Sequence, residues 1–373
     1  MEIRRRPQTG KMDHWLYIAV LGISAFGLVM MFSASYYSAQ YSASTNHDGF
    51  FYLRNQVQYL LIGIVGMYVM SRIQYRYLEK LKVIALVVTI LLMIAVVFWG
   101  RELNGAKRWL KIGGLPSFQP SELAKFVLIL YMASFMASHG HMMQDFVRGM
   151  VPMLIIMGAL AALLLMQRNM SMAMIVLLIG AVMLFIGGAS MKHLFGLGML
   201  MIPLFLVLAK VQPYRWARLT IFTDPWKDPL GSGYQLIQSL YALGNGGLFG
   251  KGLNFSTQKL RFLTYGESDF IFSIIGEELG FVGCVLLMGA YFFVIWRGVR
   301  IAARCKDRFG SLLAGGITLV LALQVAVNIG VATSSVPPTG QTLPFISAGG
   351  TSLVIFMMAV GILLNISRDI QLD

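Results

Sequence analysis

Long runs of apolar residues, separated by short polar segments, dominate the pattern of this 373-residue chain. A helix needs about 20 apolar residues to cross a hydrocarbon core about 30 Å thick, and ten segments approach or reach that length. They are Trp15–Tyr37, Val57–Met70, Val83–Trp99, Gln119–Ser138, Met150–Met166, Ser171–Ser190, Leu194–Ala209, Asp269–Trp296, Leu312–Thr333 and Phe345–Asn365. We expect each of them to be a helix, because lipid cannot satisfy exposed backbone amides.

The composition fits a membrane protein. Hydrophobic residues make up 57% of the chain and charged residues only 12%, whereas soluble domains carry about 25% charged residues. The net charge of +14 would suggest nucleic acid in a soluble protein, but in a membrane protein it is typical of cytoplasmic loops. We therefore predict an all-α polytopic membrane protein with about ten transmembrane helices and no nucleic-acid partner. Two cysteines exclude a disulfide-rich scaffold and a four-cysteine zinc site.

The distribution of Lys and Arg predicts the orientation. With the N-terminus inside, the inner segments hold sixteen basic residues and the short outer loops hold six. Short cytoplasmic loops are enriched in Lys and Arg, so both termini are predicted to be cytoplasmic. The first apolar run is too long for a signal-peptide core and is interpreted as an uncleaved helix. The chain then forms one integral membrane domain, 1–373, with a cytoplasmic segment 1–14 and a cytoplasmic tail 366–373.

A long polar connection, 210–268, separates the seventh and eighth predicted helices. Loops of more than about 15 residues are usually functional or disordered. This one contains ten Phe, Tyr and Trp residues, and disordered segments are poor in aromatics. We therefore predict a large, folded extracytoplasmic loop. A smaller outer element, Arg101–Phe118, has the same mixture of Gly, Trp and basic residues.

Two ionisable residues, Glu122 and Lys125, lie within an apolar segment. Charged groups inside a membrane are costly and are candidates for function. Their spacing of three places them on one helix face, where an ion pair either fixes helix packing or forms the polar wall of a substrate cavity. In the ninth predicted helix, Gln324 and Asn328 are four residues apart and are expected to bond to neighbouring helices.

Asp269 opens the eighth predicted helix, directly after the long loop. At the membrane boundary it would be partly desolvated, which raises the pKa of a carboxyl group and makes it a better general base. The alternative is an N-cap, for which Asp is favoured. Glu277 and Glu278 follow in the same helix and are interpreted as structural, with one of them holding a neighbouring helix in place.

The outer loops are rich in basic residues, which could bind phosphate because guanidinium groups suit that contact. They are Arg108, Lys111, Arg215, Arg218, Lys251, Lys259 and Arg261.

Six segments carry a resemblance to one family. They are Asn104–Trp109 (NGAKRW), Gln119–Lys125 (QPSELAK), Asp228–Gln235 (DPLGSGYQ), Gln238–Gly244 (QSLYALG), Asp269–Phe272 with Gly276–Phe281 (DFIF and GEELGF), and Thr339–Phe345 (TGQTLPF). Their order and spacing resemble the shape, elongation, division and sporulation (SEDS) family, which includes FtsW, RodA and SpoVE. The resemblance covers nearly the whole chain. Ser256–Lys259 (STQK) and Leu364–Arg368 (LNISR) are more similar to FtsW and SpoVE.

The resemblance implies a peptidoglycan glycosyltransferase that polymerises lipid II, a disaccharide-pentapeptide on undecaprenyl pyrophosphate. The reaction takes place at the outer face of the bacterial cytoplasmic membrane, for division, cell shape or sporulation. Family members work with a class B penicillin-binding protein and other divisome or elongasome membrane proteins. The family's catalytic Asp falls on Asp269, and its fourth-helix Glu and Lys fall on Glu122 and Lys125. We assign substrate binding to Glu122, Lys125, Arg108, Lys259, Gln258 and Arg54. No fixed cofactor is implied, although a divalent cation (Mg²⁺ or Mn²⁺) could assist the leaving pyrophosphate.

The chain departs from the family pattern near Asp269. Thr264-Tyr265 and Glu267-Ser268 replace the usual Pro-Glu and His-Thr pairs, which places a second carboxylate two residues from Asp269. Ala348 and Gln167-Arg168-Asn169 are further departures. Two other functions stay open from the sequence: a lipid II flippase that uses Glu122 and Lys125, and a non-enzymatic scaffold for the penicillin-binding protein.

Overall fold

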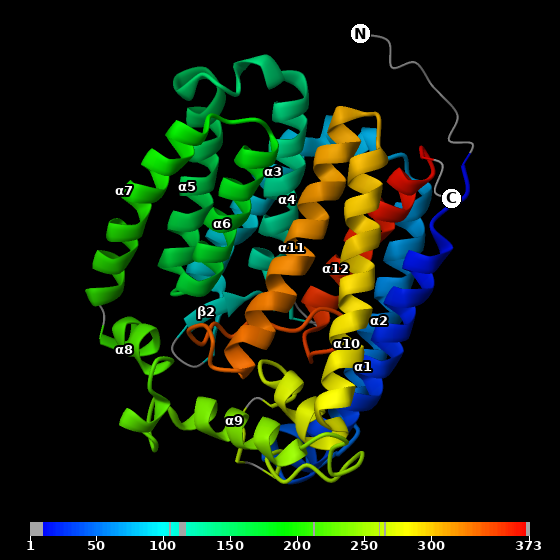
Figure 1. The fold of residues 1–373 in the computed structure, drawn as a ribbon, viewed down its shortest axis with the longest axis vertical. Coiled ribbons are helices and arrows are strands. Elements are labelled where there is room, and N and C mark those ends of the chain that lie inside the picture. Colours follow the sequence, from blue (N-terminus) through cyan, green and yellow to red (C-terminus); the bar gives the residue numbers. More distant parts are fainter. Residues whose placement is uncertain are drawn as a thin grey trace.

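The computed structural model describes residues 10–103, 106–111, 117–211, 213–260, 262–264 and 266–370. It is a bundle of long helices with short helices gathered at one end (Figure 1). The helices are α1 (His14–Gln40), α2 (Phe51–Arg72), α3 (Arg76–Trp99), α4 (Pro120–Ser138), α5 (Val151–Met166), α6 (Met170–Ile186), α7 (Met191–Lys210), α8 (Pro213–Ile221), α9 (Tyr234–Gly246), α10 (Ile271–Arg304), α11 (Arg308–Ala332) and α12 (Gly350–Ser367). One-turn helices occur at Ala43–Thr45, Gly140–Met142, Phe146–Met150 and Pro225–Lys227.

A helix is present at each of the ten predicted apolar segments. Within the described residues, seven helices are long and apolar enough to cross a membrane, and Met170–Ile186 is a shorter apolar helix. The protein is therefore a mostly helical, multi-pass membrane protein. The number of crossings and the direction in which the chain crosses the membrane stay predictions.

One element was not expected from the all-α prediction. Strands β1 (Arg101–Leu103) and β2 (Ala106–Trp109) pair antiparallel, and Leu110 forms a bridge with Phe118. The two residues between the strands, Asn104-Gly105, lie outside the described residues. The all-α prediction was wrong here because the search for apolar runs does not detect a short polar hairpin.

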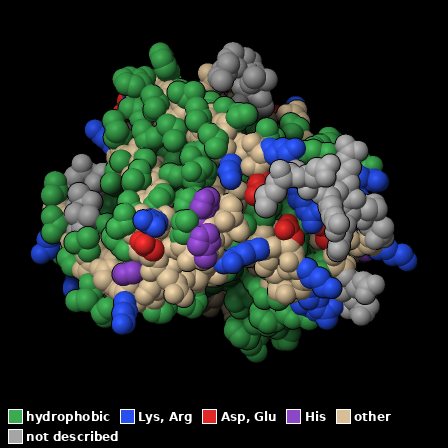
Figure 2. Space-filling model, turned by 90° about the horizontal axis from the view of Figure 1, so that it is seen from above, with side chains coloured by type: hydrophobic (Ala, Val, Ile, Leu, Met, Phe, Trp, Pro, Cys, Tyr) green, Lys and Arg blue, Asp and Glu red, His purple; other side chains and the backbone are tan. Residues whose placement is uncertain are grey.

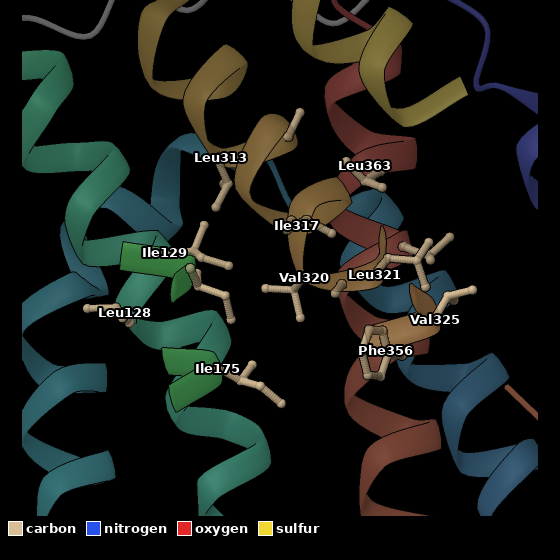
Figure 3. Packing of buried hydrophobic residues seen from close by; sticks show 14 of the residues in the cluster. Leu128, Ile129, Ile175, Leu313, Ile317, Val320, Leu321, Val325, Phe356 and Leu363 are labelled. Atoms are coloured by element: carbon tan, nitrogen blue, oxygen red, sulfur yellow. The ribbon is translucent and has the colours of Figure 1, made fainter. Parts of the chain in front are cut away.

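Helix α11 lies in the middle of the hydrophobic core. Figure 3 shows Ile317, Val320 and Leu321 of α11 between side chains of α4 and α6 on one side and of α12 on the other. These residues are almost completely buried. In lipid, helices associate through close packing rather than through exclusion of water, so this dense centre stabilises the bundle.

The end of the bundle where α1 begins and α12 ends, here called the terminal end, is held by polar contacts. Asp13 pairs with Arg297 at 2.8 Å, and its amide donates to Ser367 Oγ. The hydroxyl of Tyr75 contacts the carboxylates of Asp307 and Asp369 at 2.9 Å each. Figure 2 looks onto this end and shows Lys, Arg and His side chains among the polar surface.

The opposite end, here called the loop end, carries α8, α9, the β hairpin and the 333–349 connection (Figure 1). The predicted loop 210–268 thus contains two helices, α8 and α9. At the end of this loop, Glu267 and Ser268 bond to Ala348 and Ser347 of the 333–349 connection, directly before Asp269.

Candidate functional site

The backbone around Asp269 is fixed from the opposite side of the loop end. The amide of Ala348 donates to the carbonyl of Glu267 at 2.9 Å, and Ser347 Oγ donates to the carbonyl of Ser268 at 2.5 Å. Asn328 Nδ2, from α11, donates to the carbonyl of Asp269 at 3.0 Å. The N-cap of α10 is Phe270, without a side-chain capping bond. Asp269 therefore does not cap the helix, and its carboxylate is left for another role.

The surroundings of the Asp269 carboxylate modify its acidity. Burial raises the pKa of Asp269 above its ordinary value, while a hydrogen bond with Ser268 and the positive charges of Arg218 and Arg108 act in the opposite direction. A raised pKa brings a carboxyl group closer to the range in which it accepts a proton efficiently. The two arginines come from separate elements, α8 and β2, so the tertiary structure brings positive charge to this carboxylate.

A glycine lies beside the carboxylate. Gly340 has a φ of +66°, and a Cβ at this position would lie 3.3 Å from Oδ2 of Asp269. Any larger residue would have an unfavourable backbone conformation and would crowd that oxygen. Glycine thus keeps one side of the carboxylate accessible.

Three buried oxygens near Asp269 accept no hydrogen bond from the described residues. They are Asn328 Oδ1, Thr339 Oγ1 and Gln341 Oε1. Asn328 Nδ2 also donates to the carbonyl of Gln341 at 2.7 Å, so these groups belong to one region. Buried polar atoms without partners are uncommon, and acceptors of this kind suit the hydroxyl groups of a sugar.

The second carboxylate, Glu267, lines a cavity of about 320 Å³ together with Lys259, Ser38, Tyr52 and other residues of α1, α2 and the long loop. Burial raises the pKa of Glu267, and the negative charge of Asp269 raises it further. Glu267 and Asp269 therefore interact electrostatically, as neighbouring carboxylates do.

Glu122 and Lys125 form the ion pair that their spacing predicts. Their side chains are 2.9 Å apart and 5% and 0% exposed, so the pair is enclosed. Lys125 also donates to Oε1 of Gln324 at 2.5 Å and lies 5.3 Å from the ring centre of Phe356. This pair joins α4 to α11 and α12.

Gln324 links this ion pair to the 333–349 connection, which borders Asp269. Its Nε2 donates to the carbonyl of Thr342 at 3.1 Å, and Thr342 Oγ1 donates to Ser352 Oγ at 3.1 Å. The partners of Gln324 and Asn328 were expected on neighbouring helices. For Gln324 this expectation is confirmed in part, because its Oε1 accepts a hydrogen bond from Lys125 of α4. The other contacts of both residues are with the 333–349 connection and with the backbone of Asp269.

Gln258 and Lys259 lie in a different environment from Asp269. Lys259 is 6% exposed; its Nζ pairs with Glu278 at 2.9 Å and also donates to Asn254 and Ser33. The amide of Gln258 donates to Glu277 at 3.1 Å. Lys251 pairs with the same Glu277 at 2.8 Å. Both carboxylates therefore have partners in the long loop rather than only on a helix; the contact with a neighbouring helix is that of Glu278 with Ser33 of α1.

Two substrate-binding candidates remain, and the charge of one of them, Arg108, acts on Asp269. Arg108 Nη2 donates to the carbonyl of Arg168 at 2.7 Å, which ties β2 to the α5–α6 turn. Arg54 forms an exposed ion pair with Asp48 at the start of α2. Arg261 and the side chain of Arg215 lie outside the described residues.

Sequence reasoning did not single out Arg218 or Gly340 as neighbours of Asp269. Gly340 belongs to the TGQTLPF motif, but the motif does not indicate that this glycine lies beside Asp269. Nothing in the spacing of Arg218 points to Asp269, 51 residues later in the chain.

Comparison with known proteins gives a consistent assignment. The family model described as cell cycle protein, for FtsW, RodA and SpoVE, matches residues 14–372. The chain is 41% identical to a probable peptidoglycan glycosyltransferase FtsW of Geobacter sp. strain M18, over 95% of this chain and 96% of that protein. It is 39% identical to stage V sporulation protein E of Bacillus subtilis, over 95% and 97%.

The fold agrees with this assignment. A solved structure of a peptidoglycan synthase complex that coordinates polymerization and crosslinking contains a chain with a TM-score of 0.78 and 31% identity, with 96% of this chain and 98% of that chain covered. This chain belongs to the FtsW/RodA/SpoVE family of cell cycle proteins.

Proposed function

We propose that this protein is a peptidoglycan glycosyltransferase that polymerises lipid II into glycan strands at the outer face of the bacterial cytoplasmic membrane. Similar proteins carry the name peptidoglycan glycosyltransferase FtsW. The observation that supports the reaction most directly is the Asp269 carboxylate, which combines a raised pKa, two nearby arginines and an accessible side at Gly340.

In the proposed reaction Asp269 is the general base. Its carboxylate accepts the proton of the acceptor sugar hydroxyl while the hydroxyl oxygen bonds to the anomeric carbon of the donor. The bond between that carbon and the pyrophosphate oxygen breaks, and undecaprenyl pyrophosphate leaves with the electron pair. Arg108 and Arg218 stabilise the negative charge that develops on the pyrophosphate.

Positive charge at the leaving group is available from the protein itself. Within the described part of the chain, no group of three His, Cys, Asp or Glu side chains could hold a metal ion. We assign the positive charge at the leaving group to Arg108 and Arg218, whose charges act on Asp269.

The other predicted substrate residues are assigned supporting roles. Lys125 and Glu122 position the 333–349 connection through Gln324 and Thr342. Lys259 and Gln258 fix the loop before Asp269 through Glu278 and Glu277. Arg54, exposed at the loop end, is the candidate for a peripheral contact with the pyrophosphate. A class B penicillin-binding protein is the proposed partner, in line with the synthase complex that the fold resembles.

The test is polymerisation by purified protein and its penicillin-binding partner in liposomes, with labelled lipid II and a gel of the glycan products. Asp269→Asn keeps the shape of the side chain and removes the base. We expect a loss of about 100-fold to 10,000-fold, the usual contribution of a general base. Asp224→Asn is the matched control, because Asp224 is exposed and pairs only loosely with Lys227, at 4.0 Å.

Three results would contradict the proposal. Polymerisation by Asp269→Asn at the wild-type rate would remove Asp269 as the base. Translocation of labelled lipid II without polymerisation, abolished by Lys125→Ala, would indicate a flippase. Normal complementation of a deletion strain by Asp269→Asn would indicate a scaffold. Thermal denaturation of each variant shows whether it is folded.

A further inference from the structure

Helix α10 changes direction at Gly280. This residue has φ 70° and ψ −168° inside an otherwise helical stretch, a conformation that glycine tolerates and other residues rarely adopt. A Cβ here would lie 2.3 Å from the amide nitrogen of Gly250. The break interrupts the helical hydrogen bonds, so carbonyls before it and amides after it need other partners.

The segment 247–255 supplies those partners. The amides of Lys251 and Gly252 donate to the carbonyls of Glu277 and Glu278 at 3.0 and 2.9 Å. The amides of Phe281 and Val282 donate to the carbonyls of Gly247 and Leu248 at 2.9 and 3.1 Å. These four bonds hold the segment against α10. They also provide hydrogen-bond partners for part of the non-helical backbone of the 247–255 segment. Backbone groups next to lipid need such partners, because lipid offers none.

The break lies at the level of one membrane boundary. Ser33 Oγ of α1 donates to Glu278 at 2.7 Å, so the break is beside Ser33. Trp15, an exposed residue at the start of α1, is 18 residues away, which corresponds to about 27 Å of helix. A hydrocarbon core is about 30 Å thick, and Trp favours its edges. If Trp15 marks one edge, the 247–255 segment is at the other.

The outward side chains of the segment are large and apolar. Leu248, Phe249, Leu253 and Phe255 are 64%, 80%, 49% and 70% exposed. Lys251 is the only charged residue in the segment, and it pairs with Glu277. Exposed apolar surface of this kind marks an interaction site.

This apolar surface continues that of α10. The residues of α10 before the break, from Ile271 to Glu278, are buried, whereas the exposed apolar residues begin directly after it. Those exposed residues are Phe281, Val282, Val285 and Leu286. Because Leu248 is bonded to Val282, the two surfaces are adjacent, and the lipid that surrounds a spanning helix also reaches the segment.

From these observations we propose that the 247–255 segment is a membrane anchor whose Leu248, Phe249, Leu253 and Phe255 side chains insert into lipid at the membrane boundary. Its occupant is the lipid itself. The anchor holds the loop that precedes Asp269 at a fixed height above the bilayer, and it does so independently of the reaction that the protein performs.

Spin labels at single cysteines test the anchor, with the protein alone in lipid nanodiscs. Cys284 and Cys305 are buried and are replaced by Ala in the background. Labels at Phe249→Cys and Phe255→Cys are compared with an aqueous control, Leu230→Cys, and a lipid-facing control, Phe292→Cys; these two residues are 92% and 71% exposed. Collision with oxygen, which partitions into lipid, is compared with collision with a water-soluble nickel complex.

We expect the oxygen-to-nickel ratio at both segment sites to be severalfold higher than at Leu230→Cys and close to that at Phe292→Cys. A ratio equal to that at Leu230→Cys would place the segment in water and overturn the proposal. Low collision rates with both reagents would also overturn it, since the segment would then be covered by protein. Two label sites guard against a single variant that does not fold.

Discussion

Two carboxylates near the start of α10, Asp269 and Glu277, have opposite surroundings although only eight residues separate them. Glu277 is fully buried and accepts hydrogen bonds from Lys251, Ser256 and Thr257 and from the amide of Gln258. Among the described residues, Asp269 has a side-chain hydrogen bond with Ser268 and feels the charges of Arg218 and Arg108.

The difference distinguishes a structural carboxylate from the candidate general base. A charge whose donors are complete is stable where it is and fixes the elements around it. A carboxylate that is buried with few donors has a raised pKa and retains oxygens for a substrate. Both carboxylates are withdrawn from solvent, so their hydrogen-bond donors distinguish the candidate base from the structural carboxylate.

The largest effect is expected at Glu278, the structural carboxylate next to Glu277. In Glu278→Gln, the ammonium of Lys259 loses its buried partner. Loss of one partner of a buried pair costs about 3–5 kcal/mol, and we expect a marked fall in the midpoint of thermal denaturation. Asp269→Asn, which leaves this pair intact, is the control. An unchanged midpoint in Glu278→Gln would mean that the pair does not hold the loop.

The next effect concerns the acidity of Asp269. The general base must be deprotonated, so kcat/KM should fall as the pH decreases through the Asp269 pKa, which burial raises above its ordinary value. The charge of Arg218 lowers that pKa. Arg218→Gln should therefore move the acidic limb of the kcat/KM profile to higher pH.

The profile is measured by initial rates of polymerisation across the acidic range. Lys227→Gln is a suitable control, because Lys227 is an exposed cation of the same loop and is not among the groups that change the pKa of Asp269. A limb that stays in place in Arg218→Gln, or that moves to lower pH, would contradict the electrostatic assignment. A change in KM alone would show substrate contact without an effect on the base.

The smallest effect is expected at Arg54. Its ion pair with Asp48 is exposed, and exposed pairs contribute about 0–1 kcal/mol. Arg54→Ala should leave the thermal midpoint nearly unchanged and raise KM for lipid II with little change in kcat. Asp48→Ala, which removes the pair and keeps Arg54, distinguishes substrate binding from loss of the pair. Equal KM values in wild type and Arg54→Ala would remove Arg54 from the site.

Contacts within one helix could be predicted from the sequence, and contacts across a break could not. The i,i+3 spacing of Glu122 and Lys125 predicted an ion pair, and the structure contains it. Lys259 and Glu278 are 19 residues apart, and their pairing depends on the change of direction at Gly280. A single glycine in an apolar run is compatible with a regular helix, so the sequence pattern did not reveal that change.

The position of Asp269 was also predicted, because a boundary carboxylate follows directly from the end of a polar loop. Its neighbours were not. Arg218, Gly340 and Asn328 come from three separate parts of the chain, and only the packing of the loop end brings them to Asp269.

One side chain, Asn328, bonds through a single amide nitrogen to the carbonyls of both Asp269 and Gln341. The two chain segments that border the carboxylate are therefore coupled mechanically here, in addition to the bonds of Ser347 and Ala348. A protein that pulls on the 333–349 connection would move the proposed base, Asp269, together with the buried side-chain oxygens of Asn328, Thr339 and Gln341. The relative positions of these groups would then be preserved.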